Sequence, residues 1–175
     1  MNQHSSSPEG DRVNRDAVAL RVATQGDYFF LRNLYASTRE EEMKQFPFDD
    51  LRKKDFLDQQ FAAQYQHYQL HYPTCERNII EVGGKPAGRL WIDEWKDQIR
   101  LVDIALMPEW RGRGLGETLV REVLDRGRAA GKPVTIHVEA YNPALRMYER
   151  LGFERVDTNG VYFLMKWSDS KAVKL

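Results

Sequence analysis

The sequence contains a single cysteine, Cys75, and shows no excess of charge of either sign. One cysteine excludes a framework of intramolecular disulfides, and we interpret Cys75 as a structural or surface thiol. Lys and Arg number 26 and Asp and Glu number 26, so the formal net charge is zero. A nucleic-acid-binding protein normally shows a basic excess or a basic stripe, and we therefore expect no nucleic-acid partner.

Long apolar runs are also missing. No stretch approaches the ~18 residues that a membrane-spanning helix needs, and residues 1–16 lack the apolar centre of a signal peptide. The sequence therefore predicts no membrane association and a cytoplasmic location. Its 175 residues are enough for one domain with a sizeable core. We expect a disordered tail over residues 1–16, a single domain over 17–168 and a C-terminal tail over 169–175.

The first half of the chain predicts one strand followed by two helices. Val18–Val22 has the character of a strand. Thr24 and Asp27 form a capping-box pattern, which predicts a helix over about residues 25–43. A second helix over about residues 50–72 ends before Pro73. Its apolar stripe consists of Leu57, Phe61, Tyr65, Tyr68 and Tyr72.

The middle of the chain predicts an antiparallel meander. Its strands are Asn78–Val82, Pro86–Asp93 and Gln98–Met107, and Gly83–Gly84 is a hairpin turn between the first two. The third strand alternates strictly. One predicted face holds Val102, Ile104 and Leu106, and the other holds Leu101, Asp103 and Ala105.

The last third of the chain alternates between helices and strands. An amphipathic helix follows residue 114 and stops at Gly131. A strand over residues 134–138 comes next, then a helix with Asn142 as its N-cap. A hairpin of strands 153–157 and 161–167 follows, with its turn at Asn159–Gly160. The predicted order is β-α-α-β-β-β-α-β-α-β-β. We expect an α+β fold with a mixed, mostly antiparallel sheet of about seven strands flanked by four helices.

A glycine-rich loop, Arg111–Gly116, lies between the third meander strand and the amphipathic helix. The first N–H groups of a helix have no partner within the helix, and the helix dipole adds partial positive charge there. Glycines allow a close approach of the backbone to an anion, and Arg111 and Arg113 add charge. The arrangement is typical of a pyrophosphate site.

Other phosphate-binding loops fit this segment less well. A Walker loop ends in Gly-Lys-Ser/Thr, whereas this loop ends in Gly116–Glu117–Thr118. A dinucleotide fingerprint requires Gly-x-Gly-x-x-Gly, and the spacing of Gly112, Gly114 and Gly116 is shorter by one residue. A nucleotide-binding α/β domain stays open as an alternative interpretation. Glu139 lies at the end of the next strand, where an acidic residue could bind a ribose. A tight turn without a ligand is the remaining alternative.

Two segments together resemble the GNAT superfamily of acetyl-CoA-dependent N-acetyltransferases. Arg111, Gly114 and Gly116 match its Arg/Gln-x-x-Gly-x-Gly/Ala signature. The segment 142–153, with Asn142 and Tyr148, is similar to the family's Asn, Ala, Tyr and Gly-Phe element. One helix and one strand separate the two segments, as in the family. The resemblance covers about residues 98–167, and the first half of the chain agrees in element order alone.

The resemblance implies a GNAT-like fold in which the strands over 98–107 and 134–140 splay apart around the pantetheine arm of coenzyme A. It implies acetyl-CoA as co-substrate and no metal. It places the coenzyme A-binding groups at Ile104, Ala105, Leu106, Arg111, Gly112, Arg113, Gly114, Leu115, Gly116, Glu117, Asn142 and Tyr148.

The implied reaction is direct attack of an amine on the acetyl thioester. An amine with a pKa near ~10 is mostly protonated at neutral pH, so a base or a water chain must remove a proton. The resemblance makes Tyr148 the proton donor to the leaving thiolate. For the base we choose Asp103, because a carboxylate among Leu101, Ala105 and Met107 would have a raised pKa. Other acids at or near strand ends are Glu81, Asp93, Glu94 and Glu139.

The acceptor is a small-molecule or peptide amine that the sequence does not identify. In the family the first two helices often line the acceptor site, so tyrosines of the stripe over 57–72 are candidates for substrate contact. Glu40–Glu41–Glu42 could attract a cationic amine. His67 and His71 are spaced as metal ligands are, but a third ligand is not evident and a helix surface is the better interpretation. A non-catalytic acyl-CoA sensor is the alternative function, and a homodimer is open.

Overall fold

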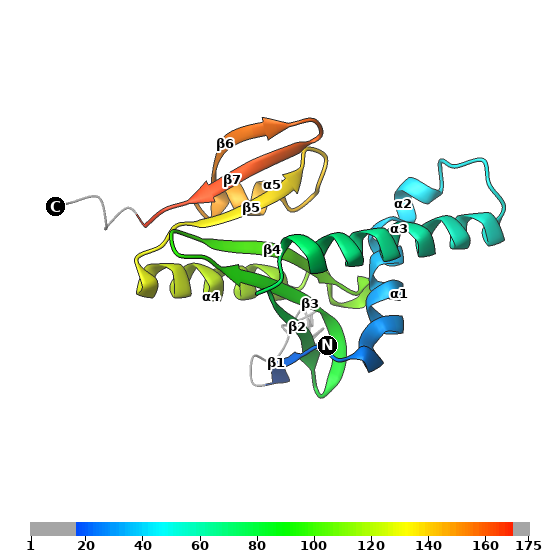
Figure 1. The fold of residues 1–175 in the computed structure, drawn as a ribbon, viewed down its shortest axis with the longest axis horizontal. Coiled ribbons are helices and arrows are strands. Elements are labelled where there is room, and N and C mark those ends of the chain that lie inside the picture. Colours follow the sequence, from blue (N-terminus) through cyan, green and yellow to red (C-terminus); the bar gives the residue numbers. More distant parts are fainter. Residues whose placement is uncertain (1–16, 170–175) are drawn as a thin grey trace, which may run out of the picture.

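The computed structural model describes residues 17–169. The tails expected at residues 1–16 and beyond 169 fall almost wholly outside that range. Seven strands form one sheet in the order β1-β2-β3-β4-β5-β7-β6, as expected for a mixed, mostly antiparallel sheet (Figure 1). All neighbouring strands are antiparallel except β4 and β5, which α4 connects in parallel.

The strands lie close to their predicted positions. Their bounds are β1 Val18–Val22, β2 Glu76–Val82, β3 Lys85–Glu94, β4 Ile99–Leu106, β5 Val134–Glu139, β6 Glu154–Asn159 and β7 Tyr162–Trp167. The turns that the sequence placed at Gly83–Gly84 and Asn159–Gly160 are present, and Gly83, Gly84 and Gly160 all have positive φ. Glycine adopts that conformation without steric strain, so these hairpins are set by local sequence.

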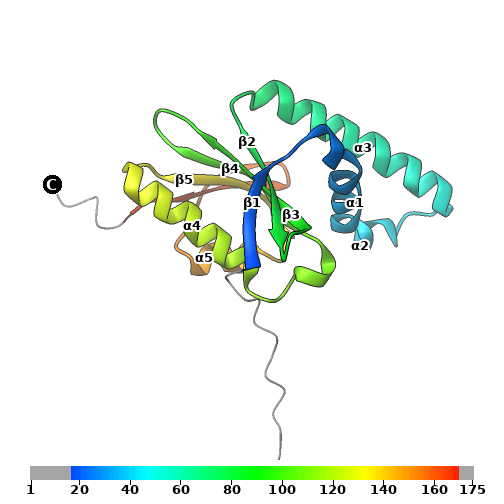
Figure 2. The same ribbon diagram turned by 90° about the horizontal axis from the view of Figure 1, so that it is seen from below.

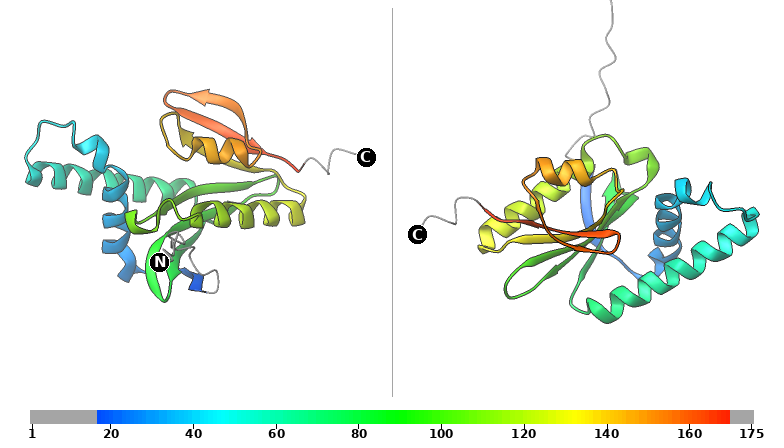
Figure 3. Two further views of the ribbon diagram at one scale, coloured as in Figure 1. Left: turned by 180° about the vertical axis from the view of Figure 1, so that it is seen from behind. Right: turned by 90° about the horizontal axis from the view of Figure 1, so that it is seen from above.

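The helices cover the sheet in two groups. Their bounds are α1 Tyr28–Thr38, α2 Glu40–Met43, α3 Asp50–His71, α4 Leu115–Ala130 and α5 Leu145–Arg150. Residues of α4 and α5 pack with the sheet in the larger apolar core. Residues of α1 and α3 form a second core around Phe61 and Trp91. The two groups lie on opposite faces of the sheet, as Figures 2 and 3 show.

The single helix predicted over residues 25–43 is wrong in detail. The chain forms a short 3-10 turn over Gln25–Asp27, then α1, and breaks at Arg39 before α2. The capping box is present, since the Asp27 carboxylate accepts a hydrogen bond from the Thr24 N–H at 2.7 Å. The break follows Ser37 and Thr38, whose hydroxyls donate to the carbonyls three residues earlier at 2.7 Å. Such side-chain bonds compete with the helical ladder.

Gly88 lies where β3 passes close to β4. A Cβ atom built on Gly88 would overlap the Ala105 carbonyl oxygen and lie 2.9 Å from Leu106 Cδ2. Both neighbours belong to the stretch of β4 that the resemblance implies for coenzyme A binding. Because Gly88 has no side chain, β4 can pack closely against β3 at this point.

Gly88→Ala is expected to reduce the free energy of unfolding by about 1–3 kcal/mol, because the added methyl group overpacks a rigid contact. Urea unfolding followed by circular dichroism measures the change. Gly26→Ala is the matched control, since its Cβ would find the nearest atom, Thr24 Oγ1, at 3.5 Å. Equal stability of the two variants would contradict the close β3–β4 contact.

Candidate active site

The strands β4 and β5 separate soon after they meet. They pair at two positions, Ile99 with Val134 and Arg100 with Thr135. From Leu101 onward, no strand in residues 17–169 pairs with the β5-facing edge of β4. Figure 1 shows the two strands moving apart. An unpaired strand edge carries backbone donors and acceptors that a ligand can satisfy, so the splay that the resemblance implied is present.

A β-bulge in β4 accompanies the separation. Trp91 pairs with Asp103 and Ile92 pairs with Leu101, so Val102 is an extra residue in β4. The strict alternation predicted for this strand is therefore wrong. Leu101 packs in the same core as Ile104 and Leu106, while Val102 packs against the α1–α3 cluster. One extra residue reverses the facing of every residue that follows it.

Asp103 is held in a side-chain network on the bulge. Its Oδ2 accepts a hydrogen bond from Arg89 Nη2 at 2.5 Å and one from the Tyr68 hydroxyl at 3.3 Å. Arg89 Nη2 also donates to Gln64 Oε1 at 3.1 Å. The apolar surroundings predicted for Asp103 are wrong, because the buried Arg89 guanidinium of β3 is its partner. The network ties α3 to the bulge, and the role of Asp103 as base stays a prediction.

The other acids proposed as bases differ in their distance from the opening. Glu81 pairs with Arg21 on the outer strands β1 and β2. Asp93 and Glu94 lie opposite Arg100 and Ile99, at the end where β4 and β5 are still paired. Glu139 is the last residue of β5 and lies beyond the separation. Geometry therefore leaves Asp103 and Glu139 beside the opening.

Tyr148 lies in α5 and is 3% exposed. Its ring packs edge-on against Phe153 with the centroids 5.5 Å apart. The hydroxyl has no hydrogen-bond partner within residues 17–169, yet it is not sealed from solvent. Burial raises the pKa of Tyr148, and the negative charge of Asp103 raises it further. The phenol is therefore protonated at neutral pH and can donate a proton.

Asn142 precedes α5 in a turn. Its side-chain oxygen accepts a hydrogen bond from the Ala144 N–H at 2.9 Å, and α5 begins only at Leu145. The N-cap predicted at Asn142 is wrong by two residues, because the N-cap of α5 is Ala144 and the Asn142 side chain and Pro143 stabilise a turn before it. The Asn142 amide NH2 has no partner within residues 17–169 and can still bind a ligand.

The glycine loop forms the N-terminus of α4. Gly112 and Gly114 have φ of 70° and 80°, in the left-handed region that favours glycine. No group in residues 17–169 accepts a hydrogen bond from the amides of residues 112–117, and the helical ladder starts with the Thr118 N–H and Gly114 carbonyl at 3.0 Å. Six backbone donors and the positive end of a 16-residue helix thus meet here. A Cβ atom added to Gly116 would make only ordinary van der Waals contact.

The charged side chains of the loop are arranged around these amides. Arg111 Nε donates to the Leu106 carbonyl at 2.8 Å and its Nη2 to Ser37 Oγ at 2.8 Å. The resemblance implied Leu106 as a coenzyme A-binding residue, and its carbonyl accepts this hydrogen bond from the loop. Arg113 stacks on Trp110, 5.4 Å from the ring centroid. The Glu117 carboxylate is paired with Arg121 and Arg150, which lower its pKa.

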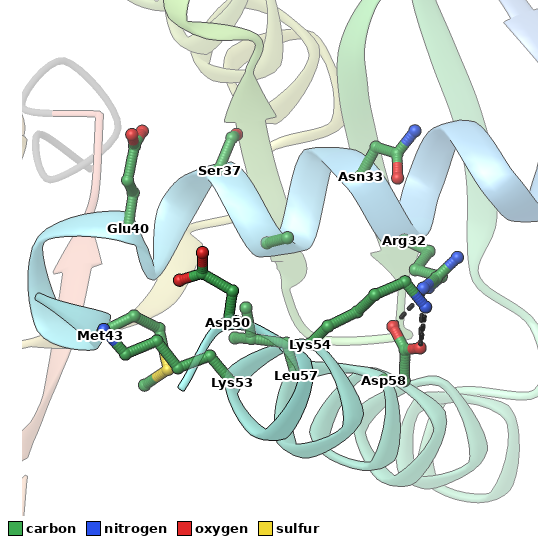
Figure 4. Close-up of a pocket in the computed structure, with 11 residues that line it drawn as sticks. Arg32, Asn33, Ser37, Glu40, Met43, Asp50, Lys53, Lys54, Leu57 and Asp58 are labelled. Carbon is green, nitrogen blue, oxygen red and sulfur yellow. Dashed lines mark hydrogen bonds and ion pairs between the residues drawn. The ribbon is translucent and has the colours of Figure 1, made fainter. Parts of the chain in front are cut away.

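A groove of about 480 Å³ lies between α1–α2 and α3 (Figure 4). Arg32 and Asp58 form an ion pair at one end of it. Its basic residues are Arg32, Lys53 and Lys54, and its acidic residues are Glu40, Asp50 and Asp58. Three charges of each sign give the groove no net charge with which to select an ionic ligand.

Within residues 17–169, no three side chains of His, Cys, Asp or Glu come together as a metal site. His67 and His71 stack with ring centroids 4.0 Å apart on the exposed side of α3. Burial raises the pKa of the Cys75 thiol to about 12, which makes it a poor nucleophile. None of the described helices is long and apolar enough to cross a membrane.

Comparison with known proteins agrees with this geometry. Residues 35–153 match the model of the acetyltransferase (GNAT) family. The chain belongs to the GNAT family. The matched segment includes β4, the glycine loop and Tyr148, and starts within α1.

Curated GNAT relatives match the chain over part of its length. A mycothiol acetyltransferase of Corynebacterium glutamicum is 37% identical over 83 residues, which are 46% of this chain and 28% of the relative. A putative ribosomal protein bS18-alanine N-acetyltransferase of Bacillus subtilis is 30% identical over 92 residues, 51% of this chain and 61% of the relative. The chain thus spans less than two thirds of the length of these relatives.

Solved GNAT structures share the fold at low identity. The PaiA N-acetyltransferase of Thermoplasma acidophilum, in complex with coenzyme A, superposes with a TM-score of 0.66 at 15% identity, covering 86% of this chain and 98% of that one. A spermidine N-acetyltransferase of Vibrio cholerae with coenzyme A and spermine gives 0.59 at 21% identity, covering 90% and 99%. These likenesses concern the fold.

Asp103→Asn is expected to weaken acetyl-CoA binding about tenfold and to lower the stability, because a lone buried Arg89 charge would loosen the bulge. Titration calorimetry and urea unfolding measure the two effects. Asp27→Asn is the control, since Asp27 forms a bidentate pair with Arg21 away from the opening. The control variant should lose stability but keep its affinity for acetyl-CoA. If both variants bind acetyl-CoA like the parent, the network does not shape the opening.

Proposed function

We propose that the protein transfers an acetyl group from acetyl-CoA to an amine by direct attack. The amine lone pair attacks the thioester carbonyl, a C–N bond forms, the C–S bond breaks, and the leaving thiolate takes a proton from Tyr148. The proton lost by the amine passes to a carboxylate or to water. The loop amides 112–117 bind the pyrophosphate, and the free edge of β4 beyond Leu101 binds the pantetheine arm.

One observation carries the proposal: β4 and β5 separate beyond their first two pairs, and the unpartnered loop amides follow the freed edge of β4. The Tyr148 hydroxyl, which has no partner within residues 17–169, is close enough to Asp103 of β4 to be affected by its charge. A pyrophosphate site alone would suit many nucleotides. A strand edge freed in the middle of a sheet suits a long, polar arm, and a protonated phenol beside it suits a thiolate leaving group. The names of the relatives and neighbours support the same chemistry.

Titration calorimetry with acetyl-CoA, and release of free thiol with a panel of amines, test the function. Binding with thiol release supports an enzyme. Binding without release from any amine supports the alternative, a non-catalytic acyl-CoA sensor. Absence of acetyl-CoA binding at millimolar concentrations, or stronger binding of NAD or ATP, would refute the assignment of the loop.

Gly114→Ala is expected to weaken acetyl-CoA binding at least tenfold, because a side chain at φ 80° strains the backbone that presents the amides. The matched control is Gly131→Ala, at the other end of α4 with φ 63°. Both variants should lose about 1 kcal/mol of stability. Equal affinities in calorimetry would show that the loop conformation does not matter for binding.

Tyr148→Phe is expected to lower kcat by about 10²-fold with little change in acetyl-CoA affinity, because it removes a general acid. The folded state should be nearly unaffected, since the hydroxyl has no partner within residues 17–169 to lose. Steady-state kinetics and calorimetry separate the two parameters. Tyr72→Phe, whose ring stacks on Trp95, serves as the control. An unchanged kcat would remove Tyr148 as the proton donor.

A further inference from the structure

The end of α1 bridges the two strands that diverge. Ser37 is bonded to Arg111, which follows β4, at 2.8 Å. Two residues later, Arg39 Nη1 lies 3.5 Å from Glu139 Oε1, at the end of β5. The segment 37–39 therefore crosses the opening on the α1 side of the sheet. An acceptor that approaches the thioester from this side meets the bridge first.

The Arg39 guanidinium sits among groups from three separate elements. Its Nε lies 2.9 Å from Glu42 Oε2 of α2, and its centre lies 6.0 Å from the ring centroid of Tyr35. Glu139 of β5 also accepts a hydrogen bond from the Tyr162 hydroxyl of β7 at 3.3 Å. Carboxylates and an aromatic face are the groups that bind organic cations. We call Tyr35, Glu42, Glu139 and Tyr162 the cation cage; in this structure the chain's own Arg39 occupies it.

An independent observation inside the cage indicates a ligand. Tyr35 is 6% exposed, but its hydroxyl has no hydrogen-bond partner within residues 17–169 and is not sealed from solvent. A hydroxyl without a partner in the protein but open to solvent can donate a hydrogen bond to a ligand or accept one from it. Burial raises the pKa of Tyr35, and the charges that act on it are Arg39, Glu42 and Glu139 together with Arg89. Tyr35, a member of the cage, is thus also close enough to Arg89 of the bulge network to be affected by its charge.

The charge of the cage favours a cation over an anion. Glu42 and Glu139 supply two negative charges against one positive charge from Arg39, and the side chains of Arg39 and Glu139 are 25% and 24% exposed. The excess is one negative charge in a partly desolvated place, where charge interactions are stronger than in water. The neutral groove between α1–α2 and α3 offers no comparable preference.

We propose that the acceptor carries a second cationic group besides the amine that reacts, and that the cation cage binds this group in place of Arg39. The reacting amine then lies deeper, past the Tyr35 hydroxyl, toward the bulge and Tyr148. The acceptor class is a diamine, a polyamine or a basic side chain on a longer amine. The inference rests on the proposed acetyl transfer and adds the chemistry of the acceptor.

The first experiment compares matched amines. Diaminobutane and diaminohexane are titrated into the protein saturated with coenzyme A, alongside butylamine and hexylamine, and kcat/KM is measured for each with acetyl-CoA. At least one diamine is expected to bind, and to react, about tenfold better than its monoamine, which is the effect of one charge-assisted contact. A diamine that binds no better than its monoamine overturns the proposal, whether or not turnover is seen.

Two variants give effects of opposite sign. Glu42→Gln is expected to raise the KM for the diamine about tenfold with little change for the monoamine, because Glu42 belongs to the cage and is not a candidate base. Arg39→Gln is expected to lower the KM for the diamine, because it removes the internal competitor. A purely structural role would impair both variants. Glu154→Gln, an equal charge change at the end of the β6–β7 hairpin away from Tyr162, is the control.

The outcomes separate the two proposals. If acetyl-CoA does not bind, the proposed function itself fails. If acetyl-CoA binds but Glu42→Gln behaves like Glu154→Gln, or Arg39→Gln raises the KM for the diamine, the acetyl transfer can stand and the cation cage is refuted. Diamine preference together with the opposite shifts in KM supports the cage.

Discussion

The Arg89–Asp103 ion pair is the interaction on which the opening depends. It lies on the bulge that takes β4 away from β5, with side chains 3% and 15% exposed. Removing one member of a buried pair typically destabilises a protein by about 3–5 kcal/mol, because a charge is left without a partner. That penalty favours the bulged conformation of β4 over a regular strand, which would point Asp103 to the opposite face. The free edge of β4 follows from this constraint.

The proposed donor and acceptor sides of the opening are built in different ways. On the donor side, backbone amides of one continuous loop converge at the end of α4, and they need only two left-handed glycines. On the acceptor side, side chains from α1, α2, β5 and β7 converge. Arg111 and Ser37 connect the two sides through one hydrogen bond. A change in the position of α1 would therefore also change the position of the loop that presents the amides.

Much of the fold could be predicted from local signals in the sequence. Gly83–Gly84, Gly131 and Asn159–Gly160 mark element ends through backbone conformations that other residues adopt poorly, and the structure has turns or caps at each. The misses have a common origin. The bulge at Val102, the break at Arg39 and the late start of α5 depend on side-chain hydrogen bonds or on pairing with distant strands, which periodicity does not report. Asp103 was singled out, but its surroundings were predicted wrongly. The sequence did contain a signal, because the charged Arg89 inside the apolar run Ala87–Ile92 needs a buried partner of opposite charge.

The same difference explains why the sequence predicts a donor and does not predict an acceptor. Coenzyme A binding is read from residues within one loop, so its pattern survives as a motif. The cation cage joins Arg39 to Glu139, 100 residues apart in the chain, and no spacing rule connects them. Arg39 fills the cage in the absence of another cation, so the chain satisfies both carboxylates without an acceptor and avoids two unpaired, partly buried charges. An acceptor must then displace an internal guanidinium, and only a ligand that replaces this positive charge leaves the carboxylates paired. The requirement for a second cationic group on the acceptor follows from that exchange.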